Sequence, residues 1–191
     1  MTAKYDSRND TIAHIMRVQQ LLGQCWVNLN YRAACHDDSK LKDPEKAIFD
    51  EMTPLLKDST YGSDEYKSFL ARMKPALDHH YAHNPHHPEH WPDGIRGMSL
   101  LDLIEMLCDW KAAGERHADG SMQRSLEVNE SRFQIDEQLA CVLRNTAIEM
   151  GWLKEAGSEH VQSEAHLPNP ARSGLSADAQ GSDCAKGAKD G

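Results

Sequence analysis

The sequence lacks the long apolar runs and the basic patches that mark two large classes of protein. No apolar stretch in its 191 residues approaches the length of a membrane span, and the first residues show no signal-peptide core. The formal net charge is −9 and Lys and Arg are scattered, which argues against binding to duplex nucleic acid but not against a nucleotide or another anionic substrate. We therefore expect a cytoplasmic protein without a membrane partner.

Paired cysteines are also missing. Five cysteines are present, an odd number, and no two of them have CxxC spacing: Cys25, Cys35, Cys108, Cys141 and Cys184. Such scattered cysteines are typical of reduced thiols in an intracellular protein rather than of a disulfide framework. We expect three or four of them to be small core residues.

Strand-like alternation and internal repeats are nearly absent, whereas apolar residues recur at helical spacing. The expected helices are about 7–30 with a bend or break at Gly23, a short segment ending at Cys35, 44–55, 64–77, 98–113, and one or two between 121 and 152. The chain is long enough to bury a core as a single domain. The pattern predicts an all-α helical bundle over residues 1–154.

The composition changes at about residue 155. Residues 155–191 are rich in Gly, Ser, Ala, Asp, Asn and Pro and show no apolar periodicity. A segment of this kind cannot bury enough apolar surface to offset the entropy of ordering its backbone. We expect a disordered C-terminal tail.

One short motif carries more chemistry than any other stretch, the run from Cys35 to Lys40. Its adjacent His36 and Asp37 offer an imidazole nitrogen and a carboxylate oxygen to one metal ion. Lys40 follows Asp37 by three residues, where an ammonium group can hold a phosphate or another anionic oxygen. A lone His-Asp pair is a weak signal, so the hypothesis depends on which residues converge on it.

Histidine is concentrated in one segment, since six of the eleven histidines fall within residues 79–90. Three prolines within residues 85–92 exclude a continuous helix through this segment and indicate a rigid loop after a helix end. Extending the apolar steps of the preceding helix reaches His80 rather than His79, so His80 is expected to face inward. We interpret the loop as a metal or substrate contact; the alternative is a solvated polar loop.

Two helices supply the remaining candidate ligands. The helix at 98–113 is apolar nearly all round, yet Asp102, Glu105 and Asp109 share one of its faces. Carboxylates on a buried helix either point to water or bind a cation. Upstream, His14 lies beside the apolar stripe of the first helix, where a boundary histidine on a core helix is the alternative interpretation.

Taken together, His14, His36-Asp37 and Asp109 resemble the ligand set of the HD superfamily of metal-dependent phosphohydrolases. His-Asp-Asp-Ser-Lys is similar to the HDxxK form of its two-metal branches, and the segment 86–94 is similar to part of the HD-GYP phosphodiesterases. The Gly-Tyr-Pro signature is absent, so a cyclic dinucleotide substrate does not follow. The chain also resembles, over residues 10–153, a small uncharacterised family of bacteria and phages.

The resemblance implies a role for each candidate residue. A first metal ion would take His14, His36, Asp37 and Asp109. A second ion would take His80 and one of His86 and His87, with His87 as our choice, while Asp37 or a water bridges the two ions. Lys40 would neutralise charge on phosphate oxygens. Glu89 is the candidate general acid.

The resulting expectation is a phosphohydrolase with one or two divalent ions, drawn from Mn, Fe, Mg, Co and Zn. Its substrate would be a small phosphorylated compound such as a nucleotide. Three alternatives stay open. A two-iron HD oxygenase would use nearly the same ligands, a non-catalytic module would use the metal for stability, and a purely structural bundle would carry the histidines by chance.

Overall fold

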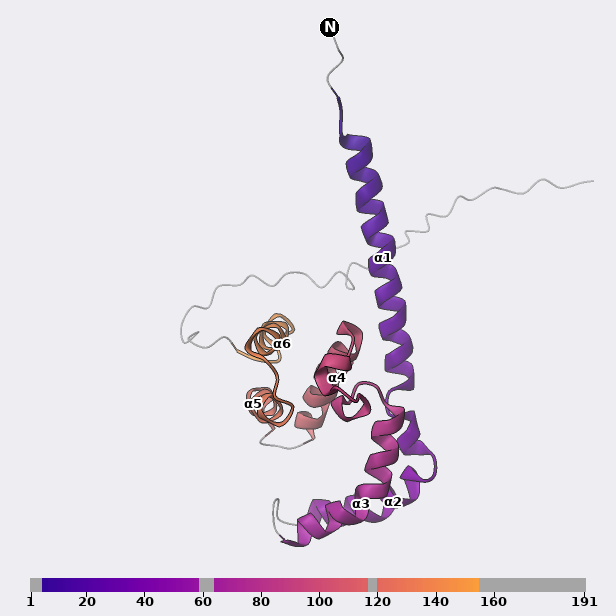
Figure 1. Cartoon of the computed structure of the whole chain (residues 1–191), viewed down its shortest axis with the longest axis vertical. Helices are drawn as coiled ribbons and strands as arrows, with labels where there is room; N and C mark the ends of the chain where they lie inside the picture. Colours follow the sequence, from indigo (N-terminus) through magenta and orange to yellow (C-terminus); the bar gives the residue numbers. More distant parts are fainter. Residues whose placement is uncertain (1–4, 59–63, 117–119, 155–191) are drawn as a thin grey trace, which may run out of the picture. The chain divides into compact units, whose positions relative to one another are not determined.

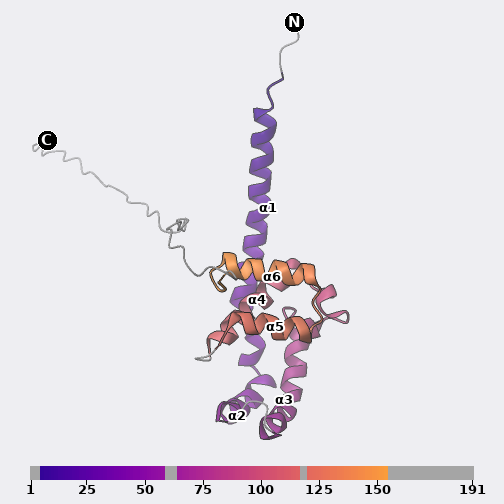
Figure 2. The ribbon, with the colours of Figure 1, turned by 90° about the vertical axis from the view of Figure 1, so that its left-hand side faces the viewer.

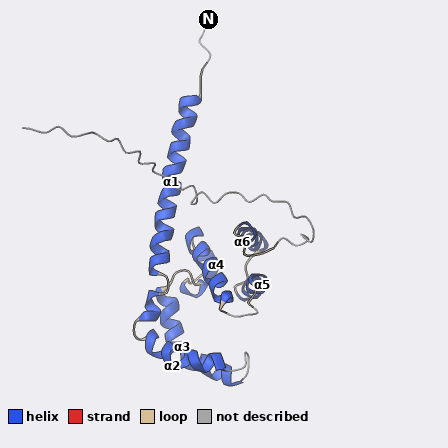
Figure 3. Ribbon diagram, turned by 180° about the vertical axis from the view of Figure 1, so that it is seen from behind, coloured by secondary structure: helices blue, strands red, loops and turns tan. Residues whose placement is uncertain are grey.

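The structure, a computed structural model, describes residues 5–58, 64–116 and 120–154 (Figure 3). Its α-helices are α1 (Arg8–Cys35), α2 (Glu45–Asp58), α3 (Asp64–His83), α4 (Leu100–Glu115), α5 (Met122–Arg132) and α6 (Glu137–Glu149). Short 3-10 helices lie between them: η1 (Asp38–Leu41), η2 (Pro88–His90) and η3 (Gly94–Gly97). No strand occurs in these three ranges, and the all-α prediction is confirmed.

The largest hydrophobic core lies between α4, α5 and α6 (Figures 1 and 2). Helix α4 contributes Met106, Leu107 and Trp110, α5 contributes Leu126, and α6 contributes Leu143, all of them buried. Ser99 caps α4 through a reciprocal pair of hydrogen bonds with Asp102, which fixes where the helix begins. With one face held in the core, α4 presents another face to α1.

Helix α1 is continuous over 28 residues, so the expected break at Gly23 is wrong. A glycine inside a helix costs only about 1 kcal/mol relative to alanine, and the helix formers on either side outweigh that cost. The C-terminal part of α1 packs against α4, where Leu29 and Ala33 face the other helix. Large apolar side chains of its N-terminal half, such as Ile12 and Ile15, are exposed.

Helices α2 and α3 pack side by side and bury Met52, Met73 and Ala76 between them. Both helices contact η1, the short element that follows the end of α1. The last turns of α3 therefore bring their side chains to the His-Asp motif. His80 is 1% exposed whereas the His79 side chain is 33% exposed, which confirms the inward orientation expected for His80.

The remaining expectations concern the cysteines, membrane-spanning helices and the C-terminal tail. Four cysteines, Cys25, Cys35, Cys108 and Cys141, are free and exposed, so their placement in the core is wrong. Among the described residues, no helix combines the length and apolar character that crossing a membrane requires. The predicted tail at 155–191 lies outside the described residues, and the domain boundary at 154 stays a prediction.

Candidate metal centre

The candidate site is centred on the turn that ends α1. Asp37 adopts the left-handed backbone conformation, with φ 58° and ψ 15°, between the end of α1 and the start of η1. Aspartate tolerates this region better than most residues because its short polar side chain can hydrogen-bond locally. The backbone of Lys40 donates a hydrogen bond of 2.9 Å to the Asp37 carbonyl. The turn aims the Asp37 carboxylate at the end of α3 and the loop after it.

A first donor set surrounds one oxygen of that carboxylate. It consists of Asp37 Oδ1 and ring nitrogens of His80, His86 and His87, all within 4.8 Å of one another. The Nε2 atoms of His80 and His86 lie 3.3 Å and 3.5 Å from Asp37 Oδ1. His80 Nε2 and His87 Nε2 are 2.9 Å apart. Three imidazoles and a carboxylate oxygen at these separations can converge on one cation.

Two atoms of the first donor set are buried without a hydrogen-bond partner, Asp37 Oδ1 and His86 Nε2. His80 Nε2, although 3.3 Å from that oxygen, does not have the alignment of a hydrogen bond. An unsatisfied buried polar atom costs roughly 1–3 kcal/mol, and more when it is charged. A cation bound between these two atoms would satisfy both, so the residues present fit a metal ion.

A second donor set uses the other oxygen of the same carboxylate. His36 Nε2 lies 3.7 Å from Asp37 Oδ2 and 3.7 Å from Asp109 Oδ1. These three side chains form a separate group that could hold a cation. Because Asp37 belongs to both sets through different oxygens, it is placed to bridge two ions.

Glu105 orients one imidazole in each set. Its carboxylate lies 3.0 Å from His36 Nδ1 and 3.2 Å from His86 Nδ1, so each ring can donate from Nδ1 and direct Nε2 inward. Arg32 Nη1 donates to the same carboxylate at 3.0 Å and to Asp102 at 2.7 Å. Histidine ligands of metal ions usually donate their second nitrogen to a carboxylate in this way.

Glu45 has the same role for His80. It is fully buried at the start of α2, and its carboxylate lies 3.0 Å from His80 Nδ1. The same group accepts hydrogen bonds from His79 Nδ1 at 2.6 Å and from the Ser39 hydroxyl at 3.0 Å. The contact with Glu45 favours the His80 tautomer that is protonated at Nδ1, which leaves the lone pair of Nε2 directed toward Asp37 and His87. His79 therefore contacts the site only through Glu45 and belongs to neither donor set.

The carboxyl groups of the site are held in their ionised form. Burial by itself would raise the pKa of Asp37, but the neighbouring His80 and Lys40 hold that pKa well below its usual range. Burial would also raise the pKa of Glu105, and the adjacent imidazoles and Arg32 lower it instead. Anionic carboxylates are the form that binds divalent cations.

The imidazoles differ from one another in protonation. The carboxylates of Asp109 and Glu105 raise the pKa of His36 to about 10, so without a cation its ring carries a proton. Burial, together with the neighbouring His86 and His80, lowers the pKa of His87 to about 3. His87 is thus neutral and ready to bind a metal ion, while His36 must first release a proton.

Lys40, the candidate phosphate-binding residue, pairs with Asp37. Its ammonium donates a hydrogen bond of 2.6 Å to Oδ2, the oxygen that belongs to the second donor set. The same ammonium lies 5.6 Å from the centre of the Phe49 ring, within range of a cation–π contact. A cation in the second donor set would take over the neutralisation of Asp37 and release Lys40 for another anion.

The structure does not bring His14 to either donor set. His14 lies on the exposed N-terminal half of α1, 22 residues before His36. At 1.5 Å per residue, that spacing corresponds to roughly 33 Å along the helix. The expectation that His14 completes the first ion is therefore wrong within one chain.

Glu89, the expected general acid, is also outside both donor sets. It lies on η2 and forms an ion pair of 2.5 Å with Arg132. This ion pair holds the Glu89 carboxylate against α5, which contributes no residue to either donor set. We do not retain Glu89 as the acid.

The sequence left the choice between His86 and His87 open and did not assign the roles of Glu45 and Glu105. His86 and His87 both belong to the first donor set, although only one of them was expected. Glu45 lies at the start of the helix expected over 44–55, and nothing local indicates its contact with His80, 35 residues later. Glu105 shares its helix face with Asp109, and that spacing was the available signal.

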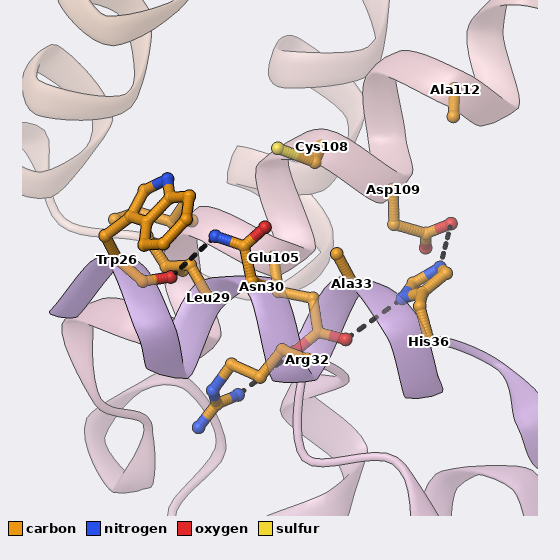
Figure 4. Close-up of a pocket in the computed structure, with 11 residues that line it drawn as sticks. Trp26, Leu29, Asn30, Arg32, Ala33, His36, Glu105, Cys108, Asp109 and Ala112 are labelled. Carbon is orange, nitrogen blue, oxygen red and sulfur yellow. Dashed lines mark hydrogen bonds and ion pairs between the residues drawn. The ribbon is translucent and has the colours of Figure 1, made fainter. Parts of the chain in front are cut away.

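A cavity of about 500 Å³ adjoins the second donor set, between α1 and α4 (Figure 4). His36 and Asp109 lie at one end, and Trp26 and Leu29 lie toward the other. Its remaining lining residues are Asn30, Arg32, Ala33, Ile104, Glu105, Cys108 and Ala112. The candidate metal centre therefore opens onto a space large enough for a small molecule.

Comparison with known proteins gives a family but no function. No curated protein and no solved structure matches the chain. One family model matches residues 3–150, which include every residue of both donor sets. The chain therefore belongs to DUF5662, a family of unknown function.

Proposed function

We propose that this protein is a divalent-metal-dependent phosphohydrolase of the HD type, acting on a small phosphorylated substrate such as a nucleotide. The observation that carries the proposal is the Asp37 carboxylate, whose two oxygens face two separate donor sets. One of those oxygens is buried without a hydrogen-bond partner. A carboxylate shared between two cation sites is the arrangement used in two-metal phosphoryl transfer.

The side chains divide the work of the proposed reaction. When bound, the two cations would supply Lewis acidity toward phosphoryl oxygens and lower the pKa of a water molecule. Glu45 and Glu105 hold the imidazoles in the orientation that binding requires. Lys40, released from Asp37, offers its ammonium to the negative charge that develops on the phosphoryl oxygens.

A second candidate is an HD-type di-iron oxygenase. The mainly apolar walls of the cavity beside His36 and Asp109 favour it, because they suit an organic substrate with little charge. Imidazole and carboxylate ligands suit iron as well as manganese. In that case the Lys40 ammonium would donate a hydrogen bond to a substrate oxygen. A module that only binds metal is a third candidate, supported by the burial of His80 and His86.

We propose the cytoplasm as the site of action. The exposed, unpaired thiols of Cys25, Cys35, Cys108 and Cys141 support a reducing compartment.

The test is phosphate release by the full chain after chelation and reloading with Mn²⁺, Co²⁺ or Mg²⁺, using 4-nitrophenyl phosphate and nucleoside monophosphates. We expect turnover to return with at least one ion and to fall about 100-fold or more in His86→Ala, since a ligand of the first donor set is lost. His83→Ala is the matched control, because His83 is exposed and outside both sets.

The same preparation separates the alternatives. Tightly held iron with a coloured, redox-active protein and no phosphate release would favour the oxygenase. Metal-dependent melting without turnover of any kind would favour the binding module. A protein indifferent to chelator would contradict all three.

A further inference from the structure

The cavity between α1 and α4 has apolar walls although it begins at a charged centre. Helix α1 supplies Trp26, Leu29 and Ala33, and α4 supplies Ile104 and Cys108 among its lining residues. Figure 4 shows the indole of Trp26 at the end of the cavity away from His36 and Asp109. A ligand bound at the metal centre would therefore extend along apolar side chains toward an aromatic ring.

The charged residues that line this cavity are already engaged with one another. Arg32 donates from Nη1 to Asp102 and Glu105 and from Nε to Asn28. Glu105 in turn lies against the Nδ1 atoms of His36 and His86. The cavity lining thus offers no uncommitted cation beyond the metal centre. A second or third phosphate placed there would lose water and meet only a guanidinium whose charge Asp102 and Glu105 already balance, which is unfavourable.

One polar group lies among the apolar walls. The Asn30 side-chain nitrogen donates a hydrogen bond of 2.8 Å to the backbone carbonyl of Trp26, which fixes the amide within the lining. Its carbonyl oxygen is left to accept a hydrogen bond from a ligand. The Trp26 side chain is 66% exposed, so one face of the indole is available for stacking on a planar group.

From these features we infer that the cavity binds the uncharged, apolar or aromatic part of a phosphomonoester whose single phosphoryl group is held at the metal centre. The inference rests on the proposed phosphohydrolase function and narrows its substrate class. A volume of about 500 Å³ lies within the range of small-molecule sites. Esters of a single phosphate are favoured over di- and triphosphates, because the charges of the latter would face Leu29 and Ile104.

The experiment is calorimetric binding of three non-hydrolysed probes, phenylphosphonate, methylphosphonate and imidodiphosphate, to the full chain loaded with Mn²⁺. We expect phenylphosphonate to bind about tenfold or more tightly than methylphosphonate, since the ring enters the apolar cavity. Imidodiphosphate is expected to bind more weakly than phenylphosphonate. Trp26→Ala should reduce the phenyl preference several-fold and leave methylphosphonate affinity and metal content unchanged.

Tyr31→Ala is the matched control. Tyr31 is an aromatic residue of the same helix, 70% exposed and outside this cavity, so its loss should preserve the phenyl preference. Equal affinity for phenylphosphonate and methylphosphonate in the unmodified protein would overturn the inference and leave the hydrolase proposal standing. Tighter binding of imidodiphosphate would overturn the single-phosphate class. Failure of every probe to bind the metal-loaded protein would instead overturn the proposed function, and the inference with it.

Discussion

At the scale of single residues, the site is built from pairs in which one group determines the state of another. Asp37 is ionised because His80 and Lys40 lie beside it, although burial opposes its charge. His36 is protonated because Asp109 and Glu105 flank it. These charges balance in the absence of a cation. A divalent ion would replace the proton of His36 and the ammonium of Lys40 as the positive partners of the carboxylates.

The raised pKa of His36 predicts that filling the second donor set releases a proton. The protonated ring predominates below pH 10 and cannot bind metal, so each unit of pH decrease below about 10 should weaken the apparent affinity about tenfold. His87, with a pKa of about 3, adds no such dependence above pH 4. Calorimetric titration with Mn²⁺ at pH 7, in buffers of different ionisation enthalpy, should report about one proton released by the second ion. Proton-neutral binding of both ions would contradict this prediction.

At the scale of elements, α4 carries three acids on one face and gives each a different task. Asp102 caps the helix and holds Arg32, Glu105 orients two imidazoles, and Asp109 faces His36 as a donor. The spacing of three and four residues was readable from the sequence, and so was the helix itself, within two residues at each end. The division of tasks was not, because it depends on partners from α1 and from the loop after α3.

Replacing Glu105 by glutamine tests this division. The amide keeps the shape of the carboxylate but removes the charge that holds the Nδ1 atoms of His36 and His86. We expect affinity for both ions to fall about 10- to 100-fold, as measured by competition with a fluorescent chelator. Glu115→Gln is the control, since Glu115 lies on the same helix, exposed and paired with Lys111. Equal metal affinity in the two variants would show that Glu105 does not orient the imidazoles for metal binding.

The sequence predicted inward-facing residues within a helix better than contacts between helices. The steps of three and four along α3 correctly placed His80 inside, because periodicity reports orientation within one element. Glu45 could not be found in this way, since its contact with His80 joins two helices. The expectation that His14 binds the first ion was wrong because of the length of one helix. A resemblance in the order of short motifs does not specify how long α1 is, and here the helix places His14 far from the site.

At the scale of the whole molecule, the donors come from the end of α1, from α3, from the loop after it and from α4. A bound ion would therefore connect elements whose hydrophobic contacts lie in separate clusters, one between α2 and α3 and the other between α4, α5 and α6. Metal binding is expected to be coupled to folding in such an arrangement.

Chelation should lower the thermal stability. An ion present at 100 times its Kd stabilises the native state by about 2.7 kcal/mol, which for a chain of this size corresponds to a decrease in Tm of roughly 5–10 °C on its removal. Scanning calorimetry with and without chelator measures the difference. His83→Ala should retain the full difference, and His86→Ala should lose the part that depends on the first donor set. A Tm that is the same with Mn²⁺ and with chelator would show that the cluster does not hold an ion.

If Asp37 joins two cation sites, as we propose, the metal content of the protein depends on Asp37 more than on any other ligand. We would measure metal by elemental analysis of the untagged protein after incubation with Mn²⁺ or Fe²⁺, alongside Asp37→Ala, Asp109→Ala and His14→Ala. We expect about two ions in the unmodified chain and in His14→Ala, about one in Asp109→Ala, and almost none in Asp37→Ala, because Asp37 alone belongs to both donor sets. No metal in the unmodified chain, or two ions retained in Asp37→Ala, would contradict the account.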